Sequence, residues 1–124
     1  IPTTSPLRNI NDINKCIKLA VDKKLDMVFT LTKSNKNPYF NMLEQKGKKF
    51  KLIKNFNKKI RRRQEAPQCY DLTTVCYVFK PSYIMQTEEV LSGKVDFIDI
   101  PKERAIDIDD KFDYKIALMS SKKK

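Results

Sequence analysis

The 124-residue chain contains no histidine, only two glycines and three cysteines. Without histidine, and with Cys16, Cys69 and Cys76 lacking any CxxC spacing, the sequence predicts neither a zinc site nor a disulfide framework. We interpret the three cysteines as small, mostly buried thiols in a reducing compartment. The shortage of glycine also means that this sequence has no glycine-rich phosphate-binding loop.

Long hydrophobic runs are missing as well. No apolar stretch approaches the length of a membrane span and nothing resembles a signal peptide, so we expect a soluble, cytoplasmic protein without a membrane partner. The composition is that of a folded protein, since 40% of the residues are hydrophobic and the chain has five Tyr and seven Phe. The length allows one modest core, and we assign residues 1–124 to a single domain.

Positive charge, by contrast, is plentiful. The 26 Lys and Arg residues outnumber the 15 Asp and Glu residues, which gives a formal net charge of +11. Much of the excess is lysine accompanied by asparagine, as in "SNKNP" and "IKNFNKKI", and we interpret it as solvated lysines rather than a designed patch. A basic balance can in general indicate nucleic acid, membrane surfaces or anionic small molecules as partners.

The spacing of apolar residues predicts strands that alternate with helices, hence an α/β fold with a largely parallel sheet and one β-hairpin excursion. The predicted elements are, in chain order, a helix over 11–24, a strand over 26–32, a hairpin over 39–53 that turns at Lys46-Gly47, a strand over 71–79, a helix over 81–93, strands over 94–100 and 105–108, and a helix over 110–120. We expect Asn11 or Asp12 to cap the first helix, and Asp109 or Asp110 to cap the last.

The stretch "RAIDIDDKFD" (104–113) gathers four aspartates in a basic chain. In an extended segment Asp107 and Asp109 share a face, about 7 Å apart at Cα. Two neighbouring carboxylates repel each other, and a cation such as Mg²⁺ or Mn²⁺ between them removes that repulsion. The alternative is that both are ordinary loop and cap residues, as we expect for Asp110 and Asp113 at the start of the last helix.

Two further stretches are candidates for binding anions. "KKIRRRQEAPQCYD" (58–71) contains three consecutive arginines, which suit bidentate contacts with carboxylate or phosphate; the alternative is a solvated basic loop. Nucleic acid is disfavoured as its partner, because the aromatic residues fall inside predicted strands rather than along a basic stripe. "TTSPLR" (3–8) is a Ser/Thr-rich turn that leads into a helix, where α/β folds bind ligands, or else an ordinary turn.

Three motifs together resemble one known family. "PTTSPLR" (2–8), "RRQEAPQCYDLTTVCYV" (62–78) and "RAIDIDDKFD" (104–113) occur in the order and spacing of the acylneuraminate cytidylyltransferases, which are the CMP-sialic acid synthetases and their relatives acting on other nonulosonic acids. The similarity extends over essentially all 124 residues. It implies an α/β, Rossmann-like nucleotidyltransferase fold and a homodimer.

The resemblance also implies a reaction and a set of site residues. Members couple CTP to a 2-keto sugar acid, giving a CMP-sugar and pyrophosphate, with Mg²⁺ (or Mn²⁺) as cofactor. Asp107 and Asp109 match the family's paired metal-binding aspartates, and Arg63 matches an arginine at the phosphate and sugar-carboxylate site, to which we assign the catalytic role. The matching substrate-binding residues are Thr4, Ser5, Arg8, Arg62, Gln64, Thr73 and Tyr77.

The chain departs from the family pattern in three places. Pro2 and Thr3 stand where many members have Gln-Pro or Gln-Ala, and Thr73-Thr74 replaces a common Asn-Gly, so both places weaken an assignment to sialic acid itself. The family's N-terminal segment, with its Arg- and Gly-rich CTP-binding loop, is absent, and we interpret the chain as the C-terminal part of a cytidylyltransferase, incomplete at the N-terminus. Two rival hypotheses are kept, namely a non-enzymatic basic module that binds nucleic acid through "KKIRRR" and an inactive paralogue paired with an active subunit.

Overall fold

The computed structural model describes residues 1–55 and 62–122, which form two compact units. The first unit comprises residues 1–32 and 72–124, and the second comprises residues 33–71. The assignment of the whole chain to one domain stays a prediction. Most of the "KKIRRR" segment, residues 58–61, lies outside the described residues.

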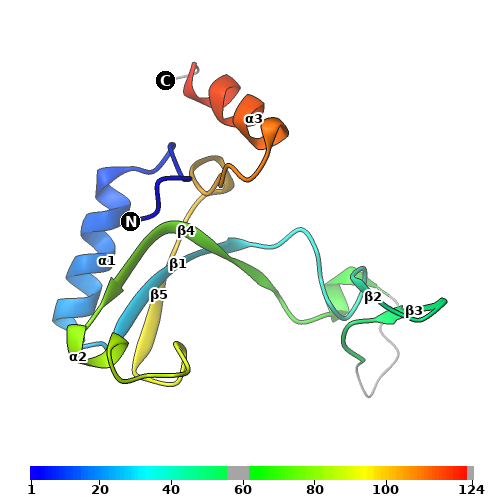
Figure 1. Ribbon diagram of the computed structural model, residues 1–124, viewed down its shortest axis with the longest axis horizontal. Coiled ribbons are helices and arrows are strands. Elements are labelled where there is room, and N and C mark those ends of the chain that lie inside the picture. Colours follow the sequence, from blue (N-terminus) through cyan, green and yellow to red (C-terminus); the bar gives the residue numbers. More distant parts are fainter. Residues whose placement is uncertain (56–61, 123–124) are drawn as a thin grey trace. The chain divides into compact units, whose positions relative to one another are not determined.

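A three-stranded sheet forms the centre of the first unit (Figure 1), with the strand order β4-β1-β5. β1 (Met27–Lys33) and β5 (Val95–Asp99) run parallel, and Phe29 on β1 lies directly opposite Phe97 on β5. Both strands are runs rich in β-branched and aromatic residues, which favour extended chain. The strands predicted over 26–32 and 94–100 are therefore confirmed to within one residue at each end.

β4 (Tyr70–Phe79) lies on the other side of β1 and runs antiparallel to it. The backbone N–H of Ser34 donates to the carbonyl of Cys69, and that of Lys80 donates to the carbonyl of Asp26, so the pairing joins the two segments in opposite order. The connection explains this, because the chain leaves β1 for the second unit and returns at the same end of the sheet. The α/β class is confirmed, but the described sheet is mixed rather than largely parallel.

α1 (Ile10–Asp22) packs against this sheet and closes a small core. Helical spacing predicts an apolar face of Ile13, Ile17, Ala20 and Val21, and this is only partly confirmed. Ile13 and Ala20 are partly buried against the core, whereas Ile17 and Val21 are exposed. Each fully buried aliphatic side chain contributes about 1.5–3 kcal/mol to folding. The buried core residues, drawn from the helix, all three strands or their ends, are Cys16, Leu25, Val28, Val75, Cys76 and Ile100.

The first helix is capped by a residue that the sequence pattern did not single out. Asn9 has extended backbone angles, and its side-chain oxygen accepts the N–H of Asn11 at 2.9 Å, so the prediction of Asn11 or Asp12 as the cap is wrong. Asp12 lies instead in the first turn, where its side chain is buried. At the other end Lys24 adopts a left-handed conformation (φ 50°), which lets the N–H of Leu25 close the helix on the carbonyl of Ala20 at 3.0 Å.

The helix predicted over 81–93 is much shorter in the structure. α2 covers only Pro81–Ile84, and successive turns follow it. The hydroxyl of Tyr83 donates to the carbonyl of Val90 at 2.8 Å and accepts the N–H of Gly93 at 2.9 Å, which folds the segment back instead of continuing the helix. A side chain at position 93 has no room, because a Cβ there would lie 2.5 Å from the Tyr83 ring.

The chain between β5 and the last helix is irregular. A 3₁₀ turn, η2 (Lys102–Arg104), is followed by residues 105–108 without regular structure, so the strand predicted there is wrong. The alternation of apolar and acidic residues imitates a strand, but the described sheet offers no neighbouring strand for it to pair with. The closing helix is confirmed as α3 (Lys111–Ser121). In residues 1–55 and 62–122, no helix is both long and apolar enough to cross a membrane.

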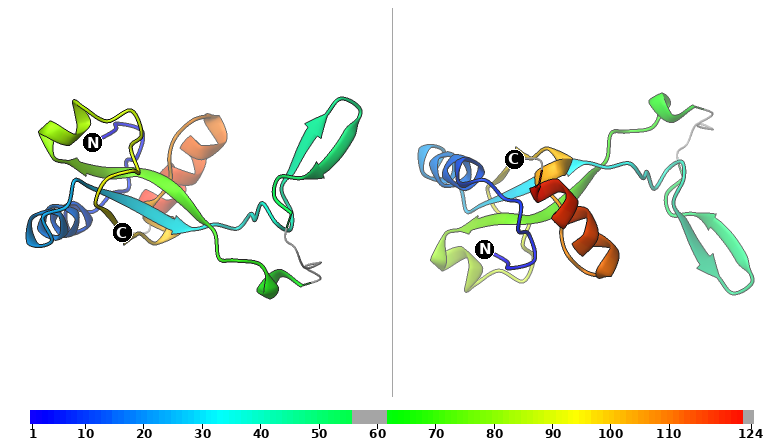
Figure 2. Two further views of the ribbon diagram at one scale, coloured as in Figure 1. Left: turned by 90° about the horizontal axis from the view of Figure 1, so that it is seen from below. Right: turned by 90° about the horizontal axis from the view of Figure 1, so that it is seen from above.

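The second unit contains the predicted hairpin, formed by β2 (Leu43–Lys46) and β3 (Lys49–Leu52) and shown in Figure 2. Gly47 in its turn has φ 62°, a conformation that glycine adopts without strain. Directly opposite residues share a face of a hairpin, which makes this one amphipathic. One face carries Leu43, Gln45, Phe50 and Leu52, and the other carries Glu44, Lys46, Lys49 and Lys51.

The net charge of the protein belongs almost entirely to the second unit. Sequence positions 33–71 contain 12 Lys and Arg residues against three Asp and Glu residues. Positions 1–32 and 72–122 contain 12 of each sign, and the remaining two positive charges are Lys123 and Lys124. The excess positive charge is therefore concentrated in one segment of the sequence.

Candidate functional site

The Ser/Thr-rich turn at the N-terminus is closed by its own residues. Ser5 is fully buried, and its hydroxyl lies 2.5 Å from that of Thr74 on β4. The half-buried guanidinium of Arg8 donates from Nε to the carbonyl of Ser5 at 2.7 Å, and also donates to the carbonyl of Pro2. These bonds fix the backbone of the turn and leave Thr4 exposed at its surface.

The structure brings this turn and the acidic segment together. The backbone N–H of Ile108 donates to the carbonyl of Thr4 at 2.9 Å. Figure 1 shows the N-terminal segment (dark blue) beside the chain that follows β5. Two motifs that are far apart in the sequence are therefore neighbours in the first unit.

Asp107 and Asp109 differ in their surroundings. Asp107 is half-buried, and its Oδ1 is buried without a hydrogen-bond partner among the described residues. Asp109 is exposed, two residues further along. Burial raises the pKa of the Tyr77 hydroxyl on β4, and the negative charge of Asp107 raises it further, which places these two candidate residues within electrostatic reach of each other.

The two other aspartates of the motif serve the last helix. Oδ1 of Asp110 accepts the N–H groups of Phe112 at 2.6 Å and Asp113 at 2.9 Å. In return, Oδ2 of Asp113 accepts the N–H groups of Asp109 and Asp110, each at 3.2 Å. This capping box confirms Asp110 as the cap of α3 and leaves Asp107 and Asp109 as the carboxylates without a structural task of that kind.

The carboxylate pair has the chemistry that a hard divalent cation requires. A buried carboxylate oxygen without a donor is costly unless a cation or water satisfies it, and Asp107 presents such an oxygen. Within the described residues, no group of three or more His, Cys, Asp or Glu side chains is placed to hold a metal ion. Mg²⁺ and Mn²⁺ fit a pair of carboxylate ligands, because such ions commonly bind one or two carboxylates and complete their coordination shell with water and phosphate oxygens.

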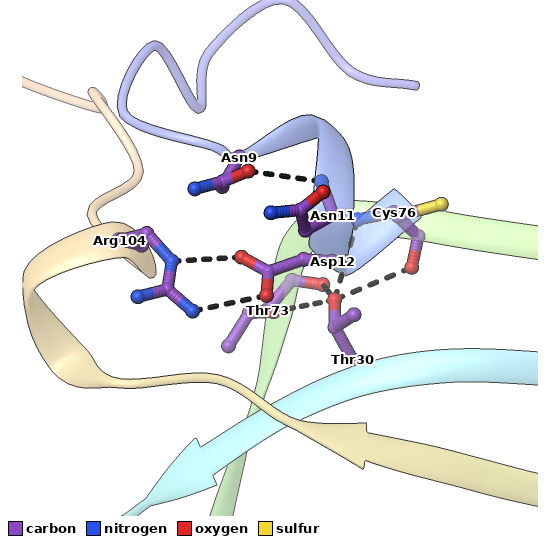
Figure 3. A network of polar contacts seen from close by, with 7 residues as sticks. All are labelled: Asn9, Asn11, Asp12, Thr30, Thr73, Cys76 and Arg104. Atoms are coloured by element: carbon purple, nitrogen blue, oxygen red, sulfur yellow. Dashed lines mark hydrogen bonds and ion pairs between the residues drawn. The ribbon is translucent and has the colours of Figure 1, made fainter. Parts of the chain in front are cut away.

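An ion pair that the sequence analysis missed lies directly before the acidic segment (Figure 3). The carboxylate of Asp12 accepts from Nε of Arg104 at 2.7 Å and from a terminal nitrogen of Arg104 at 2.9 Å. These hydrogen bonds raise the pKa of the Arg104 guanidinium above its usual value. A signal for it was present, since Asp12 has helical spacing with Cys16 and Leu19 and so falls on the buried face, where an acid requires a partner.

Thr73 points into the core rather than to the surface. It is buried, and its hydroxyl donates to that of Thr30 at 2.7 Å, as Figure 3 shows. The Thr30 hydroxyl also accepts the N–H of Cys76 at 3.3 Å and faces the carbonyl of Cys76 at 3.2 Å. The donor of Thr73 is therefore used within the fold, and its role as a substrate contact stays a prediction.

The basic candidates belong to the second unit. Arg62, Arg63 and Gln64 are exposed, and the last two open the 3₁₀ turn η1 (Arg63–Glu65). A terminal nitrogen of Arg63 donates to the carbonyl of Asn35 at 2.9 Å, and this bond holds the side chain against another segment of the second unit. The other N–H groups of the exposed guanidinium can bind an anion. Nearby, the buried Asn37 donates to the carbonyl of Pro67 at 2.8 Å and holds the two ends of this unit together.

Two characterised proteins are similar in sequence, while no family model matches the chain. "Post-translational flagellin modification protein B" of Campylobacter coli is 30% identical over 125 residues, covering 100% of this chain and 52% of that protein. "CMP-N,N'-diacetyllegionaminic acid synthase" of Campylobacter jejuni subsp. jejuni serotype O:2 is 32% identical over 89 residues, covering 72% of this chain and 37% of that protein. The chain thus spans about half the length of the first relative and less of the second.

Proposed function

Since the chain belongs to the family of CMP-nonulosonic acid synthetases, we propose that it forms part of a nucleotidyltransferase that couples CTP to a nonulosonic sugar acid. The products of this reaction are a CMP-sugar and pyrophosphate. In such a transfer a sugar hydroxyl attacks the α-phosphate of CTP, so the protein acts mainly by positioning the reactants and by neutralising phosphate charge. The observation that carries the proposal is the carboxylate pair beside the N-terminal turn, with its unsatisfied Asp107 oxygen.

We propose that Asp107 and Asp109 hold one divalent cation, Mg²⁺ or Mn²⁺. When bound, such an ion neutralises negative charge on phosphate oxygens. Support comes from the difference between the four aspartates of the motif, because Asp110 and Asp113 are engaged in capping α3 and the other pair is not. The fixed turn at Thr4 to Arg8 supports the same segment from the side through the bond between Ile108 and Thr4.

The anionic groups of the substrates require cationic partners, which we propose to be Arg63 and Arg62. Both are exposed, and a guanidinium can bind phosphate or carboxylate through two parallel hydrogen bonds. Gln64 follows Arg63 in the 3₁₀ turn η1 and adds a neutral donor and acceptor. We assign Arg63 the catalytic role, with Arg62, Gln64, Thr4, Ser5, Arg8 and Tyr77 as substrate-binding or supporting residues.

The substrate we propose is a nonulosonic acid of the legionaminic type rather than sialic acid. Pro2 stands where the family pattern has an amide-bearing glutamine, and Thr73 replaces an asparagine. Thr73 also differs from an exposed amide in the structure, because its hydroxyl is directed to Thr30 in the core. The name of the C. jejuni relative refers to an acid of this type, which supports the choice.

We also propose that the protein works as a homodimer. Support comes from the apolar face of the β2–β3 hairpin, where Leu43 is 59% exposed and Phe50 is 65% exposed. A two-stranded hairpin is marginally stable by itself, and a second copy of this chain that covers the apolar face would stabilise it.

The experiment that tests the function measures pyrophosphate release. The protein is produced from the longest reading frame that contains the chain and is incubated with CTP, Mg²⁺ and a panel of nonulosonic acids. Release that requires both the metal and a sugar acid is expected, with legionaminic-type acids as the best substrates. Absence of release with every sugar acid would overturn the proposed function, and salt-sensitive binding to nucleic acid in the same preparation would support the rival basic module.

A further inference from the structure

The acidic segment is held at two points, one on each side of Asp107. Before it, Arg104 is fixed by two hydrogen bonds to the carboxylate of Asp12, at 2.7 and 2.9 Å. After it, the N–H of Ile108 is fixed at 2.9 Å to the carbonyl of Thr4. Asp107 thus lies in a span of three residues between two anchors, and the direction of its carboxylate is set by a short piece of chain.

Both anchors come from the same region of the protein. Asp12 lies in the first turn of α1, and Thr4 lies in the turn that leads into that helix. Ala105, directly after Arg104, packs against the core, so the backbone is restrained at this position as well. The N-terminal turn and α1 therefore both bind the acidic segment and hold it in place.

The geometry of the Asp12–Arg104 ion pair is better suited to orienting the segment that carries Arg104 than to stabilising the fold. The Asp12 side chain is only 3% exposed and that of Arg104 is 30% exposed, and the contact is bidentate. A planar guanidinium with two parallel bonds fixes both the distance and the angle between its partners, which a lysine cannot do. Buried ion pairs of this kind contribute little net stability compared with apolar residues, and their best-attested use is to specify one arrangement.

We propose that Arg104 is a positioning residue that, through Asp12, aims the Asp107 carboxylate at a divalent cation. The inference rests on the proposed metal-dependent function and adds two residues to it. Arg104 does not touch the cation in this proposal, because it acts through the backbone that it anchors. Residues that orient metal ligands from outside commonly change metal affinity about 10–100-fold when they are replaced.

Direct binding of Mn²⁺ tests this inference without relying on turnover. Free Mn²⁺ is titrated by electron paramagnetic resonance against the protein from the longest reading frame, with CTP present, at a temperature where circular dichroism shows each variant to be folded. The first variant is Arg104→Lys, which keeps the positive charge but loses the two parallel hydrogen bonds of the guanidinium. The second is the double variant Asp12→Asn/Arg104→Gln, which leaves no unpaired buried charge. We expect both to raise the apparent Kd for Mn²⁺ about tenfold or more.

A matched control is Lys23→Gln, which removes an exposed ion pair with Asp96 in the same unit. It should leave the Mn²⁺ affinity unchanged, and an equal loss in this variant would overturn the inference, because any loss of positive charge would then have the same effect. Wild-type affinity in the folded Arg104→Lys and double variants overturns the inference and leaves the proposed function intact. Mn²⁺ binding that is absent in the wild type, or unaffected by Asp107→Asn, overturns the proposed metal site and this inference with it.

Discussion

Cys16 on α1 and Cys76 on β4 lie together in the buried core, where each thiol influences the pKa of the other. The two side chains are 0% and 1% exposed. Burial raises the pKa of both thiols, that of Cys16 to about 12, with the neighbouring Cys76 as a further cause. Both cysteines are therefore thiols at neutral pH, as the sequence analysis had interpreted them, and all three cysteines are free.

Thiol reactivity should distinguish these cysteines from the third one. Cys69 is partly exposed, whereas Cys16 and Cys76 are buried and protonated. Because the thiolate is the reactive form, we expect a disulfide reagent at pH 8 to label one thiol rapidly under native conditions and all three in denaturant. The Cys69→Ser variant should lose the rapid phase, and a rapid phase that persists in it would contradict the burial of the other two.

Stability should fall at alkaline pH through Cys16. A folded-state pKa raised from 9.0 to about 12 means that, between these values, the unfolded chain gives up a proton that the folded chain keeps. The free energy of unfolding therefore decreases as the pH rises from about 9 to about 12. Urea unfolding at a series of pH values measures this slope, and Cys16→Ala should flatten it. An unchanged slope in that variant would assign the alkaline loss to other groups.

Breaking the Asp12–Arg104 pair from one side should be costly. Arg104→Met leaves the buried Asp12 carboxylate without its partner, and we expect the free energy of unfolding to fall by about 3–5 kcal/mol. Lys23→Gln, which removes a partly exposed pair with Asp96, should lower it by less than about 1 kcal/mol. Urea unfolding at pH 7 compares the two variants. Equal losses of unfolding free energy would contradict the prediction, because the burial of the Asp12–Arg104 pair would then not affect stability.

Asp109→Asn should remove activity while sparing the fold. The side chain is exposed and the substitution preserves its volume, but it removes a charge that the proposed cation requires. We expect kcat for pyrophosphate release to fall by about a hundredfold or more, with an unchanged melting temperature. Asp22→Asn, an exposed acid at the end of α1, is the control. Near-normal turnover of Asp109→Asn would contradict the metal assignment.

The hairpin should determine the oligomeric state. Phe50 lies on the apolar face, and Lys49, its neighbour in the chain, lies on the charged face. We expect Phe50→Ser to convert a dimer into a monomer in sedimentation velocity, because it removes a large exposed aromatic from the proposed interface. Lys49→Ser should leave the dimer in place. A monomeric wild type at micromolar concentration would overturn the homodimer proposal itself.

The sequence was most informative where one local pattern determines the structure. The strands around Val28, Val75 and Phe97 follow from continuous β-branched and aromatic runs, and the closing helix follows from its cap at Asp110. The contact between the N-terminal turn and the acidic segment, made by the bond between Ile108 and Thr4, is by contrast a finding of the structure.

Errors arose where a distant contact overrides the local pattern. Tyr83 ends α2 early through bonds to Val90 and Gly93, which helical periodicity cannot reveal. Asp12 looked like a cap because its partner, Arg104, is 92 residues away in the sequence. Such side-chain pairings depend on how the helix docks on the sheet, and this docking is a property of the folded chain rather than of any segment of it.

The uneven distribution of charge has a consequence for how the protein responds to salt. Since positions 1–32 and 72–122 of the first unit carry 12 residues of each sign, the long-range electric fields of that part largely cancel, and added salt should affect its folding little. Positions 33–71 behave differently, because their nine excess positive charges attract phosphates and other anions and are screened as salt rises. We therefore expect the stability of the first unit to depend little on ionic strength, and the attraction of anions by positions 33–71 to weaken as ionic strength rises.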